Sequence, residues 1–429
     1  MQIIRRKILT RLIRAGALIT VFALMCTGGI GCTKKETAKV QKKETVTMWC
    51  YWDIEHNRQE LANLIDSFNE SQEKIEVTVQ YIPDEDFKKE LALSLANGTE
   101  PDIALVDSSD FRFFNYAKRF VELTDAIPEL SEYLPVAMEP CTEGKQIYGM
   151  PFGVDCTALF YNEAMLEAAG VEVPATWAAF TGAAKKLTAS GHYGFGISAV
   201  QSEEAIFSIL PIMWSKGGNV DTLDTNGGAD TFEMINELAQ AGAISRQCVS
   251  MTFRDIARQF ADEKLAMMIN TSMNVEAIRE ENPNLNFDVT YLPTDGEKVS
   301  VVGGEIFGVT EGEQQEAAIQ FLKYIADPER MASYIDDFGF LAAREDVMQN
   351  QYQDDEMLRT FFDIFQVARS RDFTQQWPQI SNIVAQTLEE SIMNERNQQE
   401  VLTEAAQKIR TIQKEASVQN GDAAGEAGE

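Results

Sequence analysis

Residues 45–106 read TVTMWCYWDIEHNRQELANLIDSFNESQEKIEVTVQYIPDEDFKKELALSLANGTEPDIALV, and this stretch decides the fold. Within it, Thr45–Trp49 and Ile75–Val79 alternate between apolar and polar side chains, as strands with one buried face do. Ile103–Val106 is an unbroken apolar run of the kind found in buried parallel strands. Two segments with helical spacing separate these three strands. The order strand, helix, strand, helix, strand predicts an open α/β sheet.

Each of the two intervening helices has an apolar face. Asp84 is the expected N-cap of the second helix, and Asn97-Gly98 is its expected end. The apolar face is formed in the first helix by Leu61, Leu64, Ile65 and Phe68, and in the second by Phe87, Leu91 and Leu95.

The remainder of the chain repeats this mixture of strands and helices. Ala158–Tyr161 and Leu265–Ile269 are expected strands, and a Gly303-Gly304 turn is expected before a further strand at Ile306–Val309. Helices dominate after residue 313. Residues 413–429 are small and acidic, which predicts a disordered tail.

Composition excludes several classes of protein. The chain has 429 residues, which suggests two or three domains, and a formal net charge of −30. Such an acidic surface repels phosphate backbones, so no nucleic-acid partner is expected. His56 and His192 are the only two histidines, which leaves little material for zinc sites or for His-assisted nucleophiles. The composition therefore indicates against a metalloenzyme, and we expect no metal. We also expect no cofactor and no catalytic residues, in keeping with the binding function that the motifs described below imply.

The first residues have the features of an export signal. Residues 1–14 carry five basic side chains and no acidic one, and an apolar run and a small-residue zone follow. The segment resembles a bacterial lipoprotein signal, in which the cysteine after a small residue is lipidated. Residues 1–31 are then the signal peptide, Cys32 is the lipidated residue, and residues 32–44 form a solvated tether. We expect an exported protein anchored to the cell membrane.

Four cysteines lie in the body of the chain, and their state is open at this point. An exported location permits disulfides, and four cysteines allow three pairings. Buried free thiols are the alternative in a chain long enough to form a full core. The four residues are Cys50, Cys141, Cys156 and Cys248.

An ordered set of motifs resembles the family 1 extracellular solute-binding proteins, the sugar-binding receptors of ABC importers, to which the maltose-binding proteins belong. The resemblance covers roughly residues 45–412. Its most specific part is GKQIYGMPF at residues 144–152, with LFYN at 159–162 and AGVEVPATW at 169–177. Further matching segments are Asn97–Asp102, Phe260–Met267 and Val301–Val309.

The resemblance implies a two-lobed, periplasmic-binding-protein-like α/β fold of type II, with ligand held in the cleft between the lobes. It places chain crossings near Gly153-Val154, Tyr291-Leu292 and Arg330–Tyr334. The N-terminal lobe then comprises residues 45–153 and 291–332. The C-terminal lobe comprises residues 154–290 and 333–412. Ligand contacts made only in the closed form would drive closure.

A sugar presents hydroxyl groups and apolar C–H faces, so its site needs aromatic surfaces beside carboxylate or amide groups. Trp52 and Asp53 offer both after the first strand, and the resemblance implies ligand binding for Asp53; a solvated loop with one buried Trp is the alternative. Asp155 matches a ligand-binding carboxylate of the family, or is a hydrogen-bonding group near a lobe crossing. Ser108 and Asp110 follow a strand and face the cleft, or cap a helix.

Other candidates come from further along the chain. Trp214 lies where relatives often place an aromatic residue of the cleft, with core packing as the alternative, and the same two roles are open for Trp377. Glu305, after the glycine pair, is expected to reach the ligand. Met273 stands where relatives commonly carry a Trp, and a thioether has no flat π-face. Trp177 is expected to be structural.

These observations predict a monomeric substrate-binding lipoprotein that binds a small solute, a sugar or oligosaccharide, and delivers it to the permease subunits of an ABC importer. It would not be an enzyme. The alternatives are a receptor of the same fold for a polyamine or other cation, a receptor that presents its ligand to a sensor kinase, and a secreted glycosidase.

Overall fold

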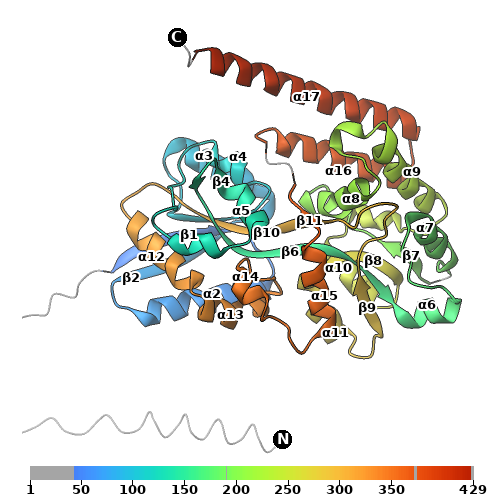
Figure 1. Cartoon of the computed structure of the whole chain (residues 1–429), viewed down its shortest axis with the longest axis horizontal. Helices are drawn as coiled ribbons and strands as arrows, with labels where there is room; N and C mark the ends of the chain where they lie inside the picture. Colours follow the sequence, from blue (N-terminus) through green and yellow to red (C-terminus); the bar gives the residue numbers. More distant parts are fainter. Residues whose placement is uncertain (1–42, 190, 372–373, 427–429) are drawn as a thin grey trace, which may run out of the picture. The chain divides into compact units, whose positions relative to one another are not determined.

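Two long strands, β6 (Met150–Asn162) and β10 (Ser300–Val309), lie in the middle of a mixed sheet and join its two halves (Figure 1). The computed structural model describes residues 43–189, 191–371 and 374–426. The sheet order is β2-β1-β3-β10-β6-β8-β7, with β9 paired to β6 and β11 paired to β10. Because β6 and β10 pair with each other and also with strands on both sides, the sheet passes without a break from one lobe to the other.

The first half of the sheet confirms the pattern expected from residues 45–106. Strand β1 (Glu44–Cys50) lies parallel to both β2 (Ile75–Tyr81) and β3 (Ile103–Asp107). Helices α2 (Glu55–Ser71) and α3 (Asp84–Asn97) bury the apolar faces that the sequence predicts. One detail was wrong, because Pro83 is the N-cap of α3 and Asp84 is its first helical residue.

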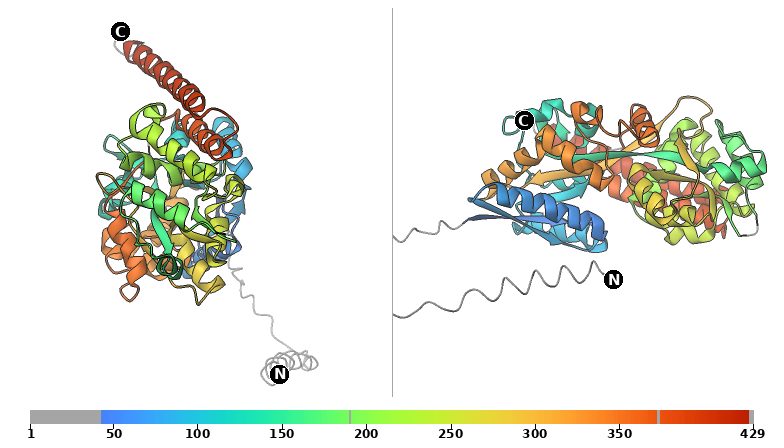
Figure 2. Two further views of the ribbon diagram at one scale, coloured as in Figure 1. Left: turned by 90° about the vertical axis from the view of Figure 1, so that its right-hand side faces the viewer. Right: turned by 90° about the horizontal axis from the view of Figure 1, so that it is seen from below.

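The second half is built around the far end of β6, which pairs antiparallel with β8 (Leu265–Thr271) and β9 (Phe287–Thr290). Strand β7 (Tyr193–Gly196) lies parallel to β8 at the edge. The two lobes stand side by side, and β6 passes between them (Figure 2). The remaining strands are short: β4 (Thr142–Glu143), β5 (Gln146–Ile147) and β11 (Ala368–Arg369).

Helices flank both halves. Those of the first half, besides α2 and α3, are α4 (Phe111–Asn115), α5 (Pro135–Met138), α12 (Gln315–Ala326), α13 (Pro328–Tyr334) and α14 (Glu345–Met348). Those of the second half are α6 (Glu163–Ala169), α7 (Trp177–Lys186), α8 (Glu203–Ser215), α9 (Asn226–Gln240), α10 (Phe253–Ala261), α11 (Val275–Glu281), α15 (Glu356–Phe365), α16 (Trp377–Met393) and α17 (Gln398–Glu426).

The glycine pair at residues 303 and 304 does not form the expected turn, because it lies inside β10. A Cβ on Gly304, whose φ is +131°, would collide with the carbonyl oxygen of Gly153 and lie 2.9 Å from the Cα of Val154. Glycine is therefore required by the close approach of β10 to β6 rather than by a reversal of the chain.

The end of the chain also differs from expectation. Helix α17 continues to Glu426 and so includes most of the residues for which a disordered tail was expected. Helix α17 contacts α16, and Val401, Leu402 and Ala406 in its first turns are buried. No helix within the described residues is long and apolar enough to span a bilayer. The predicted signal peptide, Cys32 and nearly all of the predicted tether lie outside the described residues.

All four cysteines of the body are buried free thiols. Of the two possibilities left open by the sequence, disulfides or buried free thiols, the structure therefore shows the second. Cys141 illustrates the consequence. Burial raises the pKa of its thiol to about 12, and a thiol that stays protonated is a poor nucleophile.

Candidate functional site

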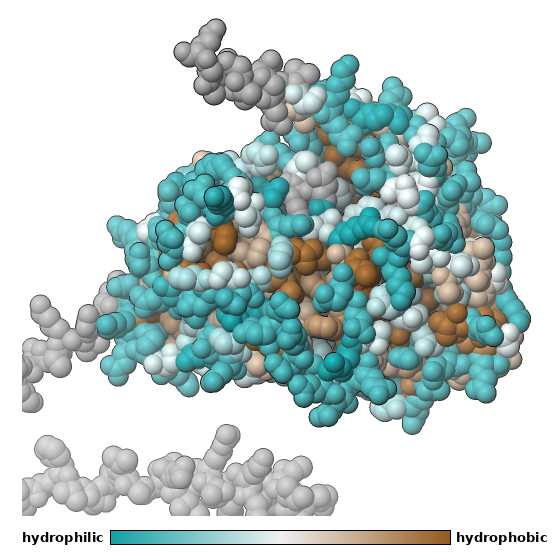
Figure 3. All heavy atoms as spheres, viewed as in Figure 1, coloured by the Kyte–Doolittle hydropathy of each residue, from teal (hydrophilic) through white to brown (hydrophobic). Residues whose placement is uncertain are grey.

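A cavity of about 440 Å³ lies where the two lobes meet the shared strands β6 and β10. This volume is within the range of roughly 300–1,000 Å³ that is usual for small-molecule sites. Hydrophilic residues cover most of the outer surface of the face shown in Figure 3, and hydrophobic residues gather in the hollow between the lobes. The cavity is lined from one lobe by α3, β3 and α4, from the other by α8 and α10, and from between them by β6 and β10.

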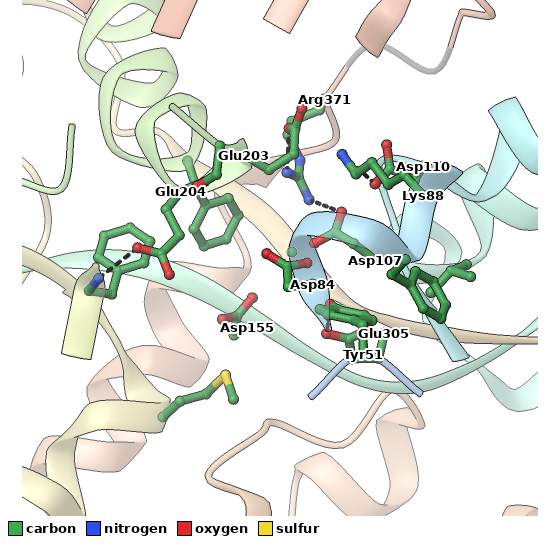
Figure 4. A pocket seen from close by; sticks show the side chains of 18 of the residues that line it. Tyr51, Asp84, Lys88, Asp107, Asp110, Asp155, Glu203, Glu204, Glu305 and Arg371 are labelled. Atoms are coloured by element: carbon green, nitrogen blue, oxygen red, sulfur yellow. Dashed lines mark hydrogen bonds and ion pairs between the residues drawn. The ribbon is translucent and has the colours of Figure 1, made fainter. Parts of the chain in front are cut away.

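A buried arginine links the two sides of the cavity (Figure 4). The side chain of Arg371 is only 2% exposed, and its Nη2 lies 3.0 Å from Asp107 Oδ1 at the end of β3. Its Nη1 lies 2.9 Å from Glu203 Oε2 in the first turn of α8. The guanidinium also lies 5.2 Å from the ring centre of Phe207. One cation thus connects a strand end of the first lobe to a helix start of the second.

A second ion pair lies in the first lobe, where Lys88 Nζ is 2.7 Å from Asp110 Oδ2. Burial raises the pKa of Asp110, and the ammonium of Lys88 opposes that effect. The other carboxylate oxygen of Asp110 is buried and has no hydrogen-bond partner among the described residues. Asp110 therefore keeps one acceptor oxygen unused at the wall of the cavity.

Only one of the two carboxylate oxygens of Glu305, on β10, has hydrogen-bond donors among the described residues. Its Oε1 accepts hydrogen bonds from Tyr51 Oη at 2.5 Å and from Trp52 Nε1 at 3.3 Å. Its Oε2 is buried and has no partner among the described residues. Burial, reinforced by the charge of Asp107, raises the pKa of Glu305 to about 8, while the two hydrogen bonds lower it.

Asp155 of β6 lies on the same wall. It is 7% exposed, and burial raises its pKa to about 7, with Arg371 and the Thr271 hydroxyl lowering it and Asp107 raising it. The position directly opposite on β10 is Gly303. A Cβ at Gly303 would collide with Asp155 Oδ1 and lie 2.6 Å from Phe207 Cζ. The glycine therefore leaves room for this carboxyl group.

Aromatic side chains supply the apolar part of the lining. They come from both lobes and lie beside the carboxyl groups just described. This combination offers flat surfaces for C–H faces and acceptors for N–H or O–H donors. The aromatic lining residues are Tyr51, Phe87, Phe114, Phe207, Phe253 and Phe340.

The structure brings four of the residues predicted from sequence to the cavity: Asp110, Asp155, Met273 and Glu305. Trp52 lies behind Glu305, in contact with Phe340 at a ring-centre distance of 6.3 Å, and does not line the cavity. Their roles in binding stay predictions.

The other predicted residues lie outside the lining. Asp53 is exposed, and Trp214 packs beside Phe207 and Phe253 with its indole N–H directed to Asn219 Oδ1 at 3.4 Å. Two further residues support charged groups of the lining. Ser108 Oγ is 3.3 Å from Arg371 Nη2, and buried Trp377 donates to Glu203 Oε2 at 3.3 Å. Trp177, expected to be structural, is buried at the start of α7.

Sequence reasoning missed the charged residues that organise the cavity: Lys88, Asp107, Glu203 and Arg371. A signal existed for Asp107, which immediately follows the apolar run 103–106 and ends the same strand. The sequence contains no comparable signal for Arg371, because its carboxylate partners Asp107 and Glu203 lie 264 and 168 residues away in the chain.

Solved structures share the fold along nearly their whole length. An ABC transporter solute-binding protein from Thermotoga lettingae, bound to α-D-tagatose, superimposes with a TM-score of 0.78 at 23% identity, covering 86% of this chain and 100% of the other. Maltose-bound MalE3 of T. maritima gives a TM-score of 0.78 at 19% identity, covering 86% and 99%. These likenesses define the class of fold, the two-lobed fold of periplasmic binding proteins.

The sequence identifies the family. Residues 63–360 match the model of the bacterial extracellular solute-binding proteins, and the chain belongs to that family. Similar proteins include a binding protein of Brucella abortus, 24% identical over 295 residues, which cover 66% of this chain and 72% of the relative. The multiple sugar-binding protein of Streptococcus mutans is 20% identical over 343 residues, which cover 75% and 81%.

Proposed function

We propose that this protein is the substrate-binding subunit of an ABC importer and that its solute is a sugar or a short oligosaccharide. The observation that carries the proposal is the cavity itself, where aromatic rings and carboxyl groups from both lobes surround one space of about 440 Å³. The names of the relatives agree, since they include sugar-binding proteins and an ABC transporter component.

The proposed mechanism is closure of the lobes around the solute. The two lobes would be residues 45–153 with 291–332 and residues 154–290 with 333–412, except that α14, within the last of these ranges, packs on α13 of the first lobe. Contacts to α3 and β3 on one side and to α8 on the other form together only when the lobes are close, so a solute that bridges them favours the closed form. A permease would then recognise that form. The protein would bind and release its solute without chemical change, as a monomer.

We further propose that lipidation at Cys32 tethers the protein to the outer face of the cell membrane. The support is the resemblance of residues 1–32 to a lipoprotein signal, together with membership in an extracellular family. A Cys32→Ser variant should be found in the medium or soluble fraction, whereas the unaltered protein should sediment with membranes. Equal partitioning of both would contradict the anchor.

Thermal unfolding against a panel of mono- and oligosaccharides tests the proposed function. A solute present at 100 times its Kd stabilises the folded protein by about 2.7 kcal/mol, which is a shift of a few degrees. Small-angle scattering with the same solute should show a smaller radius of gyration. Hydrolysis of a chromogenic glycoside by the pure protein would instead support the glycosidase alternative.

A further inference from the structure

The cavity carries far more negative than positive charge. Its lining includes eight acidic side chains and two basic ones. Both basic side chains already form ion pairs within the cavity. Arg371 pairs with Asp107 and Glu203, and Lys88 pairs with Asp110. Within residues 43–189, 191–371 and 374–426, the other five acidic residues have no ion-pair partner.

Two of these five, Asp155 and Glu305, lie together on the shared strands. Asp155 is opposite Gly303 on the neighbouring strand, and Glu305 is opposite Gly153. They are therefore diagonal neighbours on the same face of the sheet, about 7–8 Å apart in the backbone. Glycine at both opposite positions leaves room for the rings of Phe207 and Phe340, which approach Gly303 and Gly153 and also line the cavity.

An independent observation points to a hydrogen-bond donor at this place. Glu305 is more than nine-tenths buried and lines the cavity, yet its Oε2 has no donor among the described residues. A buried acceptor without a partner is unfavourable. Two neighbouring buried carboxylates are more unfavourable still unless a cation lies between them.

We propose that the solute carries a protonated primary amine and that this ammonium group lies between Asp155 and Glu305. An ammonium group has three N–H donors and no acceptor, which suits the Oε2 of Glu305, unpartnered among the described residues, together with the neighbouring carboxyl group of Asp155. The amine can belong to an amino sugar, in which case the inference rests on the proposed function, or to an aliphatic polyamine. In the sugar, the aromatic rings of the cavity contact the ring's C–H face.

The charged and polar groups that face this pair agree with a cation between them. Asp107 at the end of β3 adds negative charge, Tyr51 and Trp52 after β1 donate to the far oxygen of Glu305, and Arg371 is the one facing cation among the described residues. Since burial raises the pKa of both carboxyl groups to about 7 and about 8, an ammonium group between them would displace protons near neutral pH.

Calorimetric titration at neutral pH with four probes tests the proposal. Glucosamine dimer and N,N′-diacetylchitobiose differ only in whether the amines are free or acetylated; maltose is a neutral sugar, and spermidine is an amine without a sugar ring. We expect the free amine of the matched pair to bind at least about tenfold more tightly than its acetylated form. Binding should release protons, measurable as an enthalpy that depends on the buffer.

Variants locate the site. Asp155→Asn and Glu305→Gln keep the shape and remove one charge each, and either should weaken the amine about tenfold or more with a smaller effect on a neutral sugar. Asp66→Asn on α2 removes one exposed charge outside the cavity and should leave affinity unchanged. Because burial already favours the neutral form of both carboxyl groups, replacing either with an uncharged amide should not lower the Tm without ligand.

The outcomes separate this inference from the proposed function. Tight binding of spermidine but of no sugar, lost in the two cavity variants, supports the ammonium site and overturns the carbohydrate function. Neutral sugars that bind as tightly as the amines overturn the ammonium site and leave the carbohydrate function standing. Failure of every amine to bind overturns the ammonium site as well.

Discussion

Replacing Arg371 by methionine should lower the stability of the protein substantially. The substitution keeps an apolar stem but removes the guanidinium that is 3.0 Å from Asp107 Oδ1 and 2.9 Å from Glu203 Oε2. Removing one partner of a buried ion pair typically lowers the free energy of unfolding by about 3–5 kcal/mol. This is a large fraction of the total stability of a typical protein. The Asp107 and Glu203 side chains are 27% and 13% exposed to the cavity. We therefore expect a loss near the lower end, about 3 kcal/mol.

The measurement is thermal unfolding of the ligand-free protein. Unfolding entropy is about 2.1 cal/mol/K per residue, so a loss of about 3 kcal/mol over residues 43–429 lowers Tm by roughly 4 °C. Because Arg371 joins the two lobes, small-angle scattering should also show a larger mean radius of gyration for Arg371→Met. The control is Arg410→Met, which breaks a two-hydrogen-bond pair with Asp224 formed by an exposed arginine. Its Tm should change much less.

A compensating variant tests why Arg371→Met should lose stability. If the loss comes from uncompensated carboxylates, combining Arg371→Met with Asp107→Asn and Glu203→Gln should recover part of the lost Tm. A Tm for Arg371→Met equal to or above that of the parent protein, with the fold intact, would refute the reasoning. So would a combined variant that is no more stable than Arg371→Met alone.

Gly304→Ala should lower Tm because a Cβ there collides with the backbone of β6. The control is Gly312→Ala, where a Cβ meets nothing within 4 Å, and its Tm should not change. Equal Tm values for the two variants would contradict the close contact between β10 and β6. Burial raises the pKa values of Asp155 and Glu305 in the folded state, so their contribution to stability is complete below pH about 4 and is lost as pH rises through about 7 and 8. The Tm of the ligand-free protein should therefore fall with pH over this range and fall less in Asp155→Asn and Glu305→Gln; equal slopes would exclude these groups. Asp53→Asn should leave solute affinity unchanged while Asp155→Asn weakens it, and the reverse result in a titration would favour the sequence-based choice of Asp53 over the cavity.

Local patterns were sufficient for most of the secondary structure. The alternation in Thr45–Trp49 and the helical spacing that follows it are properties of short segments, so the strands β1–β3 and helices α2 and α3 were predictable. The Gly303-Gly304 pair was misread because glycine also serves close backbone approach, and only the neighbouring strand shows that. A local signal cannot report contacts made by a distant partner.

The residues of the cavity were likewise only partly predictable from local sequence. Asp155 and Glu305 were found from sequence because they lie beside recognisable motifs. Arg371 was missed because its role depends entirely on Asp107 and Glu203, residues on two different lobes that only the folded chain brings together. The ion-pair network, and therefore the charge left over in the cavity, could not be predicted without the structure.

The position of β10 in the sheet has a consequence for how the chain is made. β10 lies between β3 and β6, yet its first residue is Ser300. A ribosome must therefore synthesise almost three quarters of the polypeptide before either lobe has all of its central strands. Pairing across such long sequence separations is slow. We expect the nascent chain to remain incompletely folded through most of translation, which would give the secretion machinery of the cell time to engage it.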